Sequence, residues 1–251
     1  MKAGLVNVIL TYFTPISLDN LLRQSLPFSY LDVQVVATDD TEHQVELFTD
    51  IGLQFVTNEA DAACQWTQAE VLDLGGGTEI QYLDISRVTP LVFQESNDRA
   101  EYGQITFAYQ PQNASINTSY AIGKPIGESR NEFVATGKLA GVVDTKFRSM
   151  NEDWPTFAFA HDLGPVGKEA KSLRYVLGHT REPALQYVTP SGIEIRHEFW
   201  RSHFSTVAEA VRLSFLCVWN RDINSRSIRH FSCSSFIKTM RLHRKKHGTW
   251  T

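Results

Sequence analysis

Hydrophobic and polar residues alternate along much of the first two-thirds of the chain. The segments Val6–Tyr12, Leu31–Val35 and Val45–Leu47 each place an apolar residue at every second position. This spacing puts one face of a strand in a core and the other in water, as in antiparallel sheets that pack on one face. Further strands are expected at Glu79–Ile85, Gln104–Tyr109, Phe157–Ala160, Leu173–Gly178 and Ile193–Phe199. Many short strands separated by turns predict an all-β protein, an antiparallel β-sandwich.

Two connections between these strands have recognisable local chemistry. Ser17 can accept hydrogen bonds from the amides that follow it, which predicts a short helical turn between Pro15 and Gln24. The run Asp39–Thr41 supplies turn residues between Val35 and Val45, so we expect the two flanking strands to form a hairpin.

The pattern changes near residue 205, where apolar residues begin to recur at helical spacing. The apolar positions are Val207, Val211, Phe215 and Val218. Thr206 and Glu209 have the spacing of a capping box, which marks the start of a helix. We therefore divide the chain into a β-sandwich over residues 1–205, a helix over 206–219 and a tail over 220–251.

The tail is strongly basic. Its cations are Arg221, Arg226, Arg229, Lys238, Arg241, Arg244, Lys245 and Lys246, and its one acid is Asp222. Such a run can bind nucleic acid or an acidic membrane, or it can be a solvated, disordered segment. We expect residues 220–251 to be disordered and to pack little against the sandwich, because their apolar residues fit neither strand nor helix periodicity.

The composition of the whole chain agrees with a folded domain and gives no sign of a nucleic-acid or membrane partner. Hydrophobic residues make up 42% of the chain, aromatic residues 11%, and the net charge is -4. These values argue against disorder of the whole chain and indicate neither a nucleic-acid nor a membrane partner. The segment Met1–Val8 reads as a strand, so we expect no signal peptide in this chain; either the protein is cytosolic or its true N-terminus is missing.

Five segments form a further pattern. Thr14–Ile16 followed by Arg23–Leu31 is similar to the run S-P-I-x-x-D-x-L-R-Q-S-L-P-F-S-Y-L at the start of the fungal glutaminase A family. The later segments His43–Ile51, Gln65–Trp66, Glu95–Gly103 and Phe157–Gly164 resemble the family motifs H-x-V-Q-L-Y-T-D-I, Q-W, E-x-x-D-x-A-x-W-G and F-A-F-A-x-D-L-G. The resemblance extends in order from about Val6 to about Ala210.

The resemblance implies a secreted fungal enzyme that hydrolyses glutamine to glutamate and ammonia. In that family a β-sandwich precedes a larger helical domain, similar to the (α/α) toroids of six-hairpin glycosidases, which carries the chemistry. This chain would then be an accessory N-terminal domain whose partner is the helical catalytic domain, and it would be inactive alone. Residues 220–251 match nothing in the family, and we interpret them as the product of a frameshift or of an intron read as coding, with a real divergent tail as the alternative.

Candidate catalytic residues are weak. Asp50 and Asp162 fall at or near strand ends, where a carboxylate pair could perform acid–base chemistry but where aspartate more often accepts backbone amides. His161 could be a general base, although a buried or exposed structural histidine is the commoner case. Ser149 has no recognisable base near it in the sequence. We therefore assign no catalytic residue and leave a contribution from Asp50 or Asp162 open.

Metal and cofactor motifs are also missing from the sequence pattern. His197 and His203 fail the H-E-x-x-H spacing because Arg201 occupies the required position. The glycine run 75–77 lacks the residues of a phosphate-binding loop. The isolated cysteines Cys64, Cys217 and Cys233 match no zinc motif and are too few for a disulfide scaffold. We expect no cofactor.

Two surface features remain. Trp200, together with Val207, Val211 and Phe215, is expected to form an interface with the second domain, because aromatic residues suit such seams. Asn113 and Asn117 each begin an N-glycosylation tripeptide, consistent with secretion. The alternative function is a carbohydrate-binding or structural module attached to a glycosidase-like domain, which rests on fold analogy. The oligomeric state is left open.

Overall fold

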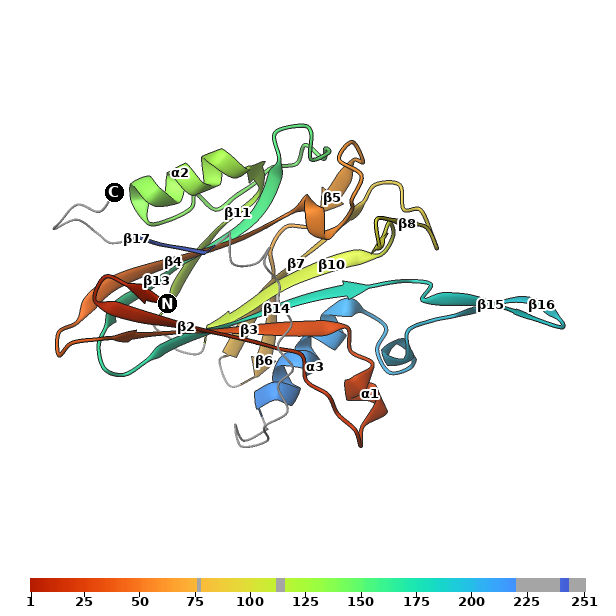
Figure 1. The fold of residues 1–251 in the computed structure, drawn as a ribbon, viewed down its shortest axis with the longest axis horizontal. Coiled ribbons are helices and arrows are strands. Elements are labelled where there is room, and N and C mark those ends of the chain that lie inside the picture. The colour runs from red at the N-terminus through yellow and green to blue at the C-terminus, as the bar shows by residue number, and fades with distance from the viewer. Residues whose placement is uncertain (76–77, 112–115, 220–239, 244–251) are drawn as a thin grey trace.

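The computed structural model describes residues 1–75, 78–111, 116–219 and 240–243. Within these residues the chain forms two facing β-sheets with a helix on each outer side (Figure 1). The first sheet has the order β1-β2-β3-β14-β10-β7-β5, and β6 also pairs with β7. Its strands are β1 (Lys2–Ala3), β2 (Val6–Phe13), β3 (Phe28–Ala37), β5 (Cys64–Trp66), β6 (Glu70–Gly75), β7 (Thr78–Arg87), β10 (Gln104–Pro111) and β14 (Lys171–Thr180).

The second sheet has the order β12-β11-β13-β4-β17 among the described residues. Its strands are β4 (His43–Gly52), β11 (Asn117–Pro125), β12 (Val142–Val143), β13 (Pro155–Val166) and β17 (Met240–His243). The pairing is antiparallel except between β11 and β12. The prediction of an antiparallel β-sandwich is confirmed.

The remaining elements are short. They are α1 (Leu21–Gln24), η1 (Leu53–Phe55), β8 (Glu95–Ser96), β9 (Arg99–Ala100), α2 (Ile126–Thr136), β15 (Leu185–Thr189), β16 (Gly192–Arg196), η2 (Phe199–Ser202) and α3 (Val207–Trp219). The predicted strand at Ile193–Phe199 ends earlier, at Arg196, and Phe199 begins the 3-10 helix η2. The helical turn expected before Gln24 is α1, and Asn20 rather than Ser17 caps it through the Arg23 amide.

The main core lies between the sheets and follows the alternation seen in the sequence. Leu31, Val33 and Val35 are buried, while Gln34 on the same strand is exposed. In β4 the residues from Val45 to Gly52 are all buried, because α2 covers the outer face of this sheet through Phe133. A strand covered on both faces has no exposed side, so even its polar residues Glu46 and Asp50 are buried.

The hairpin expected between Val35 and Val45 is wrong. β3 pairs with β2 and β14 in the first sheet, whereas β4 pairs with β13 and β17 in the second. The turn chemistry is present, since Asp39 accepts from the Thr41 amide and lies 2.7 Å from the His43 imidazole. A local turn reverses the chain, but burial decides which strand becomes the partner, and here the chain passes from one sheet to the other.

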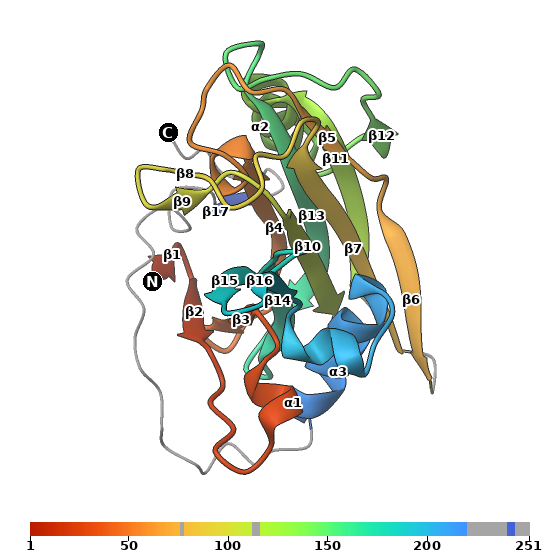
Figure 2. The same cartoon turned by 90° about the vertical axis from the view of Figure 1, so that its right-hand side faces the viewer.

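The predicted helix is present as α3, and its capping box is formed. Thr206 Oγ1 accepts from the Glu209 amide at 3.2 Å, and the Glu209 carboxylate accepts from the Thr206 amide at 3.1 Å. α3 packs on the outer face of the first sheet (Figure 2). The side chains of Val207, Val211 and Phe215 are buried there against Tyr30 and other sheet residues.

Most of the basic tail lies outside the described residues. Met240–His243 form β17, which pairs antiparallel with β4 through Met240–Thr49 and Leu242–Leu47. These four residues pair with β4, and the rest of the expectation for residues 220–251 falls outside the described residues. The free edge of β4 explains the contact, because an unpaired edge is a template for any nearby extended segment.

Candidate functional site

A cavity of about 670 Å³ lies at one end of the sandwich. Most of its lining residues come from four segments, and Phe55, Ile105 and Tyr175 complete the wall. The four segments are Tyr12–Thr14 at the end of β2, Pro27–Leu31 at the start of β3, Asp98–Ala100 at β9, and Leu177–Arg181 at the end of β14. Three of these segments overlap the motifs on which the family resemblance rests. Sequence reasoning singled out the motifs but missed the cavity, because only the fold brings them together.

The cavity wall combines aromatic rings with a few polar groups. The aromatic lining residues are Tyr12, Phe13, Tyr30, Phe55 and Tyr175. The rings of Phe13 and Tyr30 are stacked, with centroids 5.1 Å apart and planes at 13°. The hydroxyls of Thr14 and Ser29 lie 2.8 Å apart at the mouth, and Asp98 and Arg181 add exposed charges. Such a lining suits an organic molecule with one apolar face and several polar groups.

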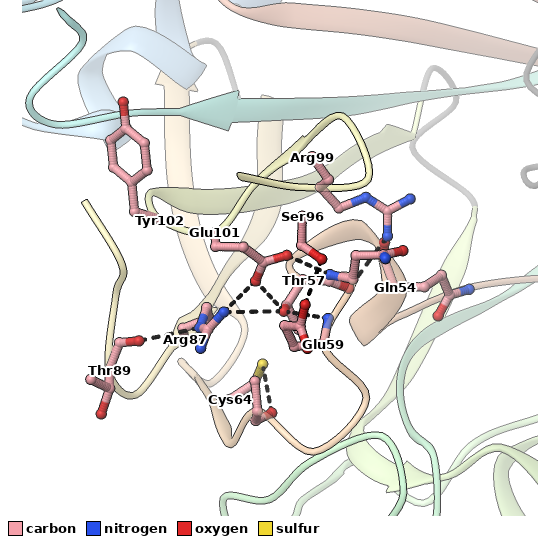
Figure 3. Close-up of polar contacts among 12 residues, drawn as sticks. Gln54, Thr57, Glu59, Cys64, Arg87, Thr89, Ser96, Arg99, Glu101 and Tyr102 are labelled. Atoms are coloured by element: carbon pink, nitrogen blue, oxygen red, sulfur yellow. Dashed lines mark hydrogen bonds and ion pairs between the residues drawn. The ribbon is translucent and has the colours of Figure 1, made fainter. Parts of the chain in front are cut away.

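A buried ion pair holds the wall of the cavity formed by β8 and β9 (Figure 3). The Glu101 carboxylate pairs with Arg87 and accepts from the Thr57 hydroxyl, and the Asn58 amide donates to it at 2.8 Å. We call Thr57, Arg87 and Glu101 the Glu101 cluster. Burial raises the pKa of Glu101, but the hydrogen bonds from Thr57, Asn58 and Arg87 outweigh it, and the net pKa lies below its usual value. Glu101 is therefore a structural anion.

The hairpin of β8 and β9 has a conformation that its sequence explains. Its two turn residues, Asn97 and Asp98, have φ values of 47° and 61°. Asn and Asp tolerate positive φ better than other residues with a side chain, and primed two-residue turns require it. Ser96 donates to Glu59 at 2.5 Å, and Arg99 donates to the carbonyl oxygens of Gln54 and Thr57. These contacts fix where Asp98 faces the cavity.

The described lining residues do not form a nucleophile–base pair. The hydroxyls of Thr14 and Ser29 contact each other, and the imidazole of the lining, His179, lies with Nε2 3.0 Å from the Tyr102 carbonyl. Burial lowers the pKa of His179, so the ring is neutral and its Nε2 proton goes to that carbonyl.

The carboxylates singled out in the sequence have structural partners. Asp50 is fully buried and accepts from Arg130 of α2 at 2.8 Å and 3.1 Å. Asp162 accepts the Gly164 amide at 2.9 Å where β13 has a bulge. In the β4–β13 register Asp50 pairs with Ala158, four residues from Asp162. Four residues of a strand span about 13 Å between Cα atoms, and each carboxylate already has a partner, Arg130 for Asp50 and the Gly164 amide for Asp162.

His161 is buried between the sheets. Its Nδ1 lies 2.8 Å from the Thr118 hydroxyl, and its ring packs against Tyr109 and Tyr175. Burial lowers the pKa of His161 to about 3, so it is a neutral core residue with no path to solvent. Ser149 is also buried, next to an Arg148 that pairs with Asp144.

The expected interface residues lie inside this chain. Trp200 is fully buried, its indole donates to Glu198 at 2.8 Å, and the Arg201 guanidinium lies over its ring. Val207, Val211 and Phe215 share that buried cluster, so a second domain could meet only the other side of α3, where Leu216 is exposed. An interface with a second domain at this helix stays a prediction.

The remaining sequence features lie partly within and partly outside the described residues. In the described part of the chain no group of three or more His, Cys, Asp or Glu side chains could hold a metal ion, and no helix is long and apolar enough to span a membrane. His197 pairs with Glu182 on the surface. Cys64 is a buried thiol. Asn117 is the exposed first residue of β11, while Asn113 lies outside the described residues, so glycosylation stays a prediction.

Comparisons with known proteins complete the picture. Residues 1–220 match the family described as "Domain of unknown function (DUF5127)". The chain is 34% identical over 213 residues to "Glutaminase A" of Aspergillus oryzae, and 25% identical over 219 residues to "Probable glutaminase" of Arthroderma benhamiae. Each match covers 84% of this chain but only 29% and 24% of the two relatives. The region similar to this chain thus spans only about a quarter of the length of these curated relatives.

Proposed function

We propose, from the premise that this chain belongs to the family described as "Domain of unknown function (DUF5127)", that it is an accessory β-sandwich domain of a glutaminase A-like amidohydrolase. The observation that carries the proposal is the partial match: the region similar to this chain makes up 29% of a protein named glutaminase A. The rest of such a protein would supply the groups that hydrolyse the amide of glutamine.

The geometry of the described residues agrees with an accessory role. Asp50 is engaged by Arg130, and Glu101 by Arg87 and Thr57. Both carboxylates are held in ion pairs with arginines of this chain. An extracellular location and glycosylation at Asn113 and Asn117 belong to the same proposal, which rests there on the family resemblance.

Ammonia release tests the accessory role directly. We expect the purified chain to release no ammonia from glutamine in an assay coupled to glutamate dehydrogenase. We expect a chimera in which residues 1–219 replace the similar segment of the Aspergillus oryzae glutaminase A to remain active. Steady ammonia release by the purified chain, abolished by Asp98→Asn or His179→Gln, would overturn the proposal.

A second candidate function is carbohydrate binding in the cavity. The observation that favours it is the lining, in which the stacked rings of Phe13 and Tyr30 lie beside the hydroxyls of Thr14 and Ser29. Isothermal titration with neutral mono- and oligosaccharides tests this function. Binding that Phe13→Ala weakens, but that the exposed Phe147→Ala leaves unchanged, would support it; the absence of heat at millimolar sugar would exclude it.

A further inference from the structure

A two-stranded ribbon projects from the same end of the sandwich as the cavity. It consists of β15 and β16, which pair only with each other among the described strands. We call residues 185–196 the arm. In Figure 1 the arm extends beyond every other element of the molecule, and Arg181 of the cavity lies just before it in the chain. An isolated two-stranded ribbon is only marginally stable in water, so this one needs further support.

The register assigns each arm residue to one of two faces. Val188 pairs with Ile193, and Gln186 pairs with Ile195. Directly opposed residues share a face, and successive residues along a strand alternate between faces. Val188, Ile193 and Ile195 therefore lie on one side, which we call the apolar face. Tyr187, Glu194 and Arg196 lie on the other side.

The second side is satisfied by its own polar contacts. The Tyr187 hydroxyl donates to Glu194 at 2.9 Å, and Arg196 donates to Glu194 at 2.8 Å and to the Tyr187 oxygen at 2.7 Å. The Arg196 guanidinium also lies 5.4 Å from the centre of the Tyr187 ring. Leu185, 49% exposed, also lies on this side opposite Arg196, and Gln186 lies on the apolar face opposite Ile195. The polar contacts nevertheless cover most of this side, whereas three of the four residues on the opposite side are apolar.

The apolar face has no such cover. The side chains of Val188, Ile193 and Ile195 are 83%, 68% and 49% exposed. Scattered exposed apolar residues are ordinary, but here they are neighbours on one face of a projecting element. β-branched residues on one side of a ribbon are the pattern of a strand that packs against something.

We propose that the apolar face of the arm docks against the further domain that the longer members of this family carry in the same polypeptide. This inference rests on the proposed accessory role and adds its contact surface. The two relatives continue for most of their length beyond the region similar to this chain, so a large linked partner is at hand.

The size of the face decides between a linked domain and a second copy. A stable interface between separate proteins uses about 20 to 30 residues on each side. Three apolar side chains fall far below that number, so two free copies would not stay joined through the arm. A linked domain sits at an effective concentration near the millimolar range, where a small anchor suffices.

The first test uses the 251-residue chain alone, with threonine replacing the apolar face in Val188→Thr/Ile193→Thr/Ile195→Thr. Threonine keeps β-branching and removes the apolar contact. We expect a monomer in sedimentation, faster amide exchange in the arm than in β3, and an unchanged Tm in the variant. A dimer that the variant dissociates would instead assign the face to a second copy, and a Tm loss like that of a core substitution would show that the face packs within this chain.

The second test uses the chimera with the Aspergillus oryzae glutaminase A. We expect at least tenfold slower exchange of the arm amides than in the chain alone. The triple variant should remove this protection, whereas the matched control Val71→Thr/Val88→Thr/Val142→Thr, at side chains 52%, 47% and 42% exposed elsewhere, should retain it. An active chimera whose arm exchanges as fast as in the chain alone would refute the docking and leave the accessory role standing; a folded chimera that releases no ammonia would count against the accessory role.

Discussion

Removal of the positive partner of Glu101 is the sharpest test of how the cavity wall is held. The side chains of Arg87 and Glu101 are 10% and 2% exposed. Arg87→Met keeps much of the length of the side chain and removes its charge. The Glu101 carboxylate would then retain the Thr57 hydroxyl and the Asn58 amide as its hydrogen-bond donors.

The magnitude follows from the cost of a buried, unpaired charge. Breaking a buried ion pair by deleting one partner costs about 3–5 kcal/mol. We expect about 3 kcal/mol here, the lower end of that range, because two hydrogen bonds remain. For a domain of this size, about 3 kcal/mol corresponds to a fall in Tm of roughly 6–12 °C. That is a large share of a total stability on the order of 5–15 kcal/mol.

Urea denaturation and thermal melts followed by circular dichroism measure this loss. The matched control is Arg196→Met, which removes the same group from a pair with Glu194 whose side chains are 59% and 40% exposed. Exposed pairs contribute about 0–1 kcal/mol, so the control should change little. Arg87→Met/Glu101→Leu should recover much of the loss, since it removes the buried charge as well. The reasoning is refuted if Arg87→Met shifts the urea midpoint no more than Arg196→Met does.

The pH dependence of stability is a second test of the Glu101 cluster. The pKa of folded Glu101 lies below its usual value, so the folded state holds this proton less tightly than the unfolded chain does. Its contribution to stability is therefore present above about pH 4.3, the ordinary pKa of glutamate, and is lost as pH falls through the folded value. In Glu101→Gln this part of the acid sensitivity should disappear.

Three further predictions concern other parts of the fold. The pKa of His161 in the folded chain is about 3. The stability of the fold should therefore decrease as pH drops from about 6.5 toward 3, by up to about 1.4 kcal/mol per pH unit. His161→Phe should flatten that slope in urea titrations at stepped pH, and an unaltered slope would contradict the prediction. Gly123→Ala should destabilise the fold by about 1–3 kcal/mol more than Gly141→Ala. Both glycines have positive φ, but of the two only Gly123 would place its new Cβ against another residue, 2.5 Å from the Trp66 ring. Equal losses of unfolding free energy in chemical denaturation would refute the clash. Burial raises the pKa of the Cys64 thiol to about 12. In a Cys217→Ser/Cys233→Ser chain, Ellman's reagent at pH 8 should therefore label Cys64 only after unfolding. Rapid labelling of the folded chain would show that Cys64 is accessible.

Several local features could be predicted from the sequence because each depends on neighbours along the chain. The alternation of Leu31, Val33 and Val35 is a property of one strand, and it located a core face correctly. The capping box of Thr206 and Glu209 closes within four residues and formed as expected. The motif Glu95–Gly103 stood out as a pattern, although its spacing does not reveal that Asn97 and Asp98 turn the hairpin that walls the cavity.

Contacts between segments far apart in the sequence could not be predicted from the sequence pattern. Turn residues at Asp39–Thr41 predicted a hairpin, yet β3 and β4 belong to different sheets, since pairing is decided by which buried edges meet. Asp50 pairs with Arg130, and Glu101 pairs with Arg87 and accepts a hydrogen bond from Thr57. Hydrophobic periodicity along the chain does not predict such partners, because they lie on different segments. The cavity exists only because the ends of β2, β3 and β14 converge on the β8–β9 hairpin.

The two apolar surfaces near the C-terminal side show the limit most clearly. The sequence by itself determined that α3 is an amphipathic helix and that Ile193 and Ile195 alternate along a strand, because those patterns express backbone geometry. Only the tertiary structure decided that the stripe of α3 is buried on this chain's own sheet while the apolar face of the arm is exposed. The physical reason is that apolar periodicity predicts which surface of an element is to be buried. It does not predict which element covers that surface, because the covering element lies elsewhere in the chain or in a partner.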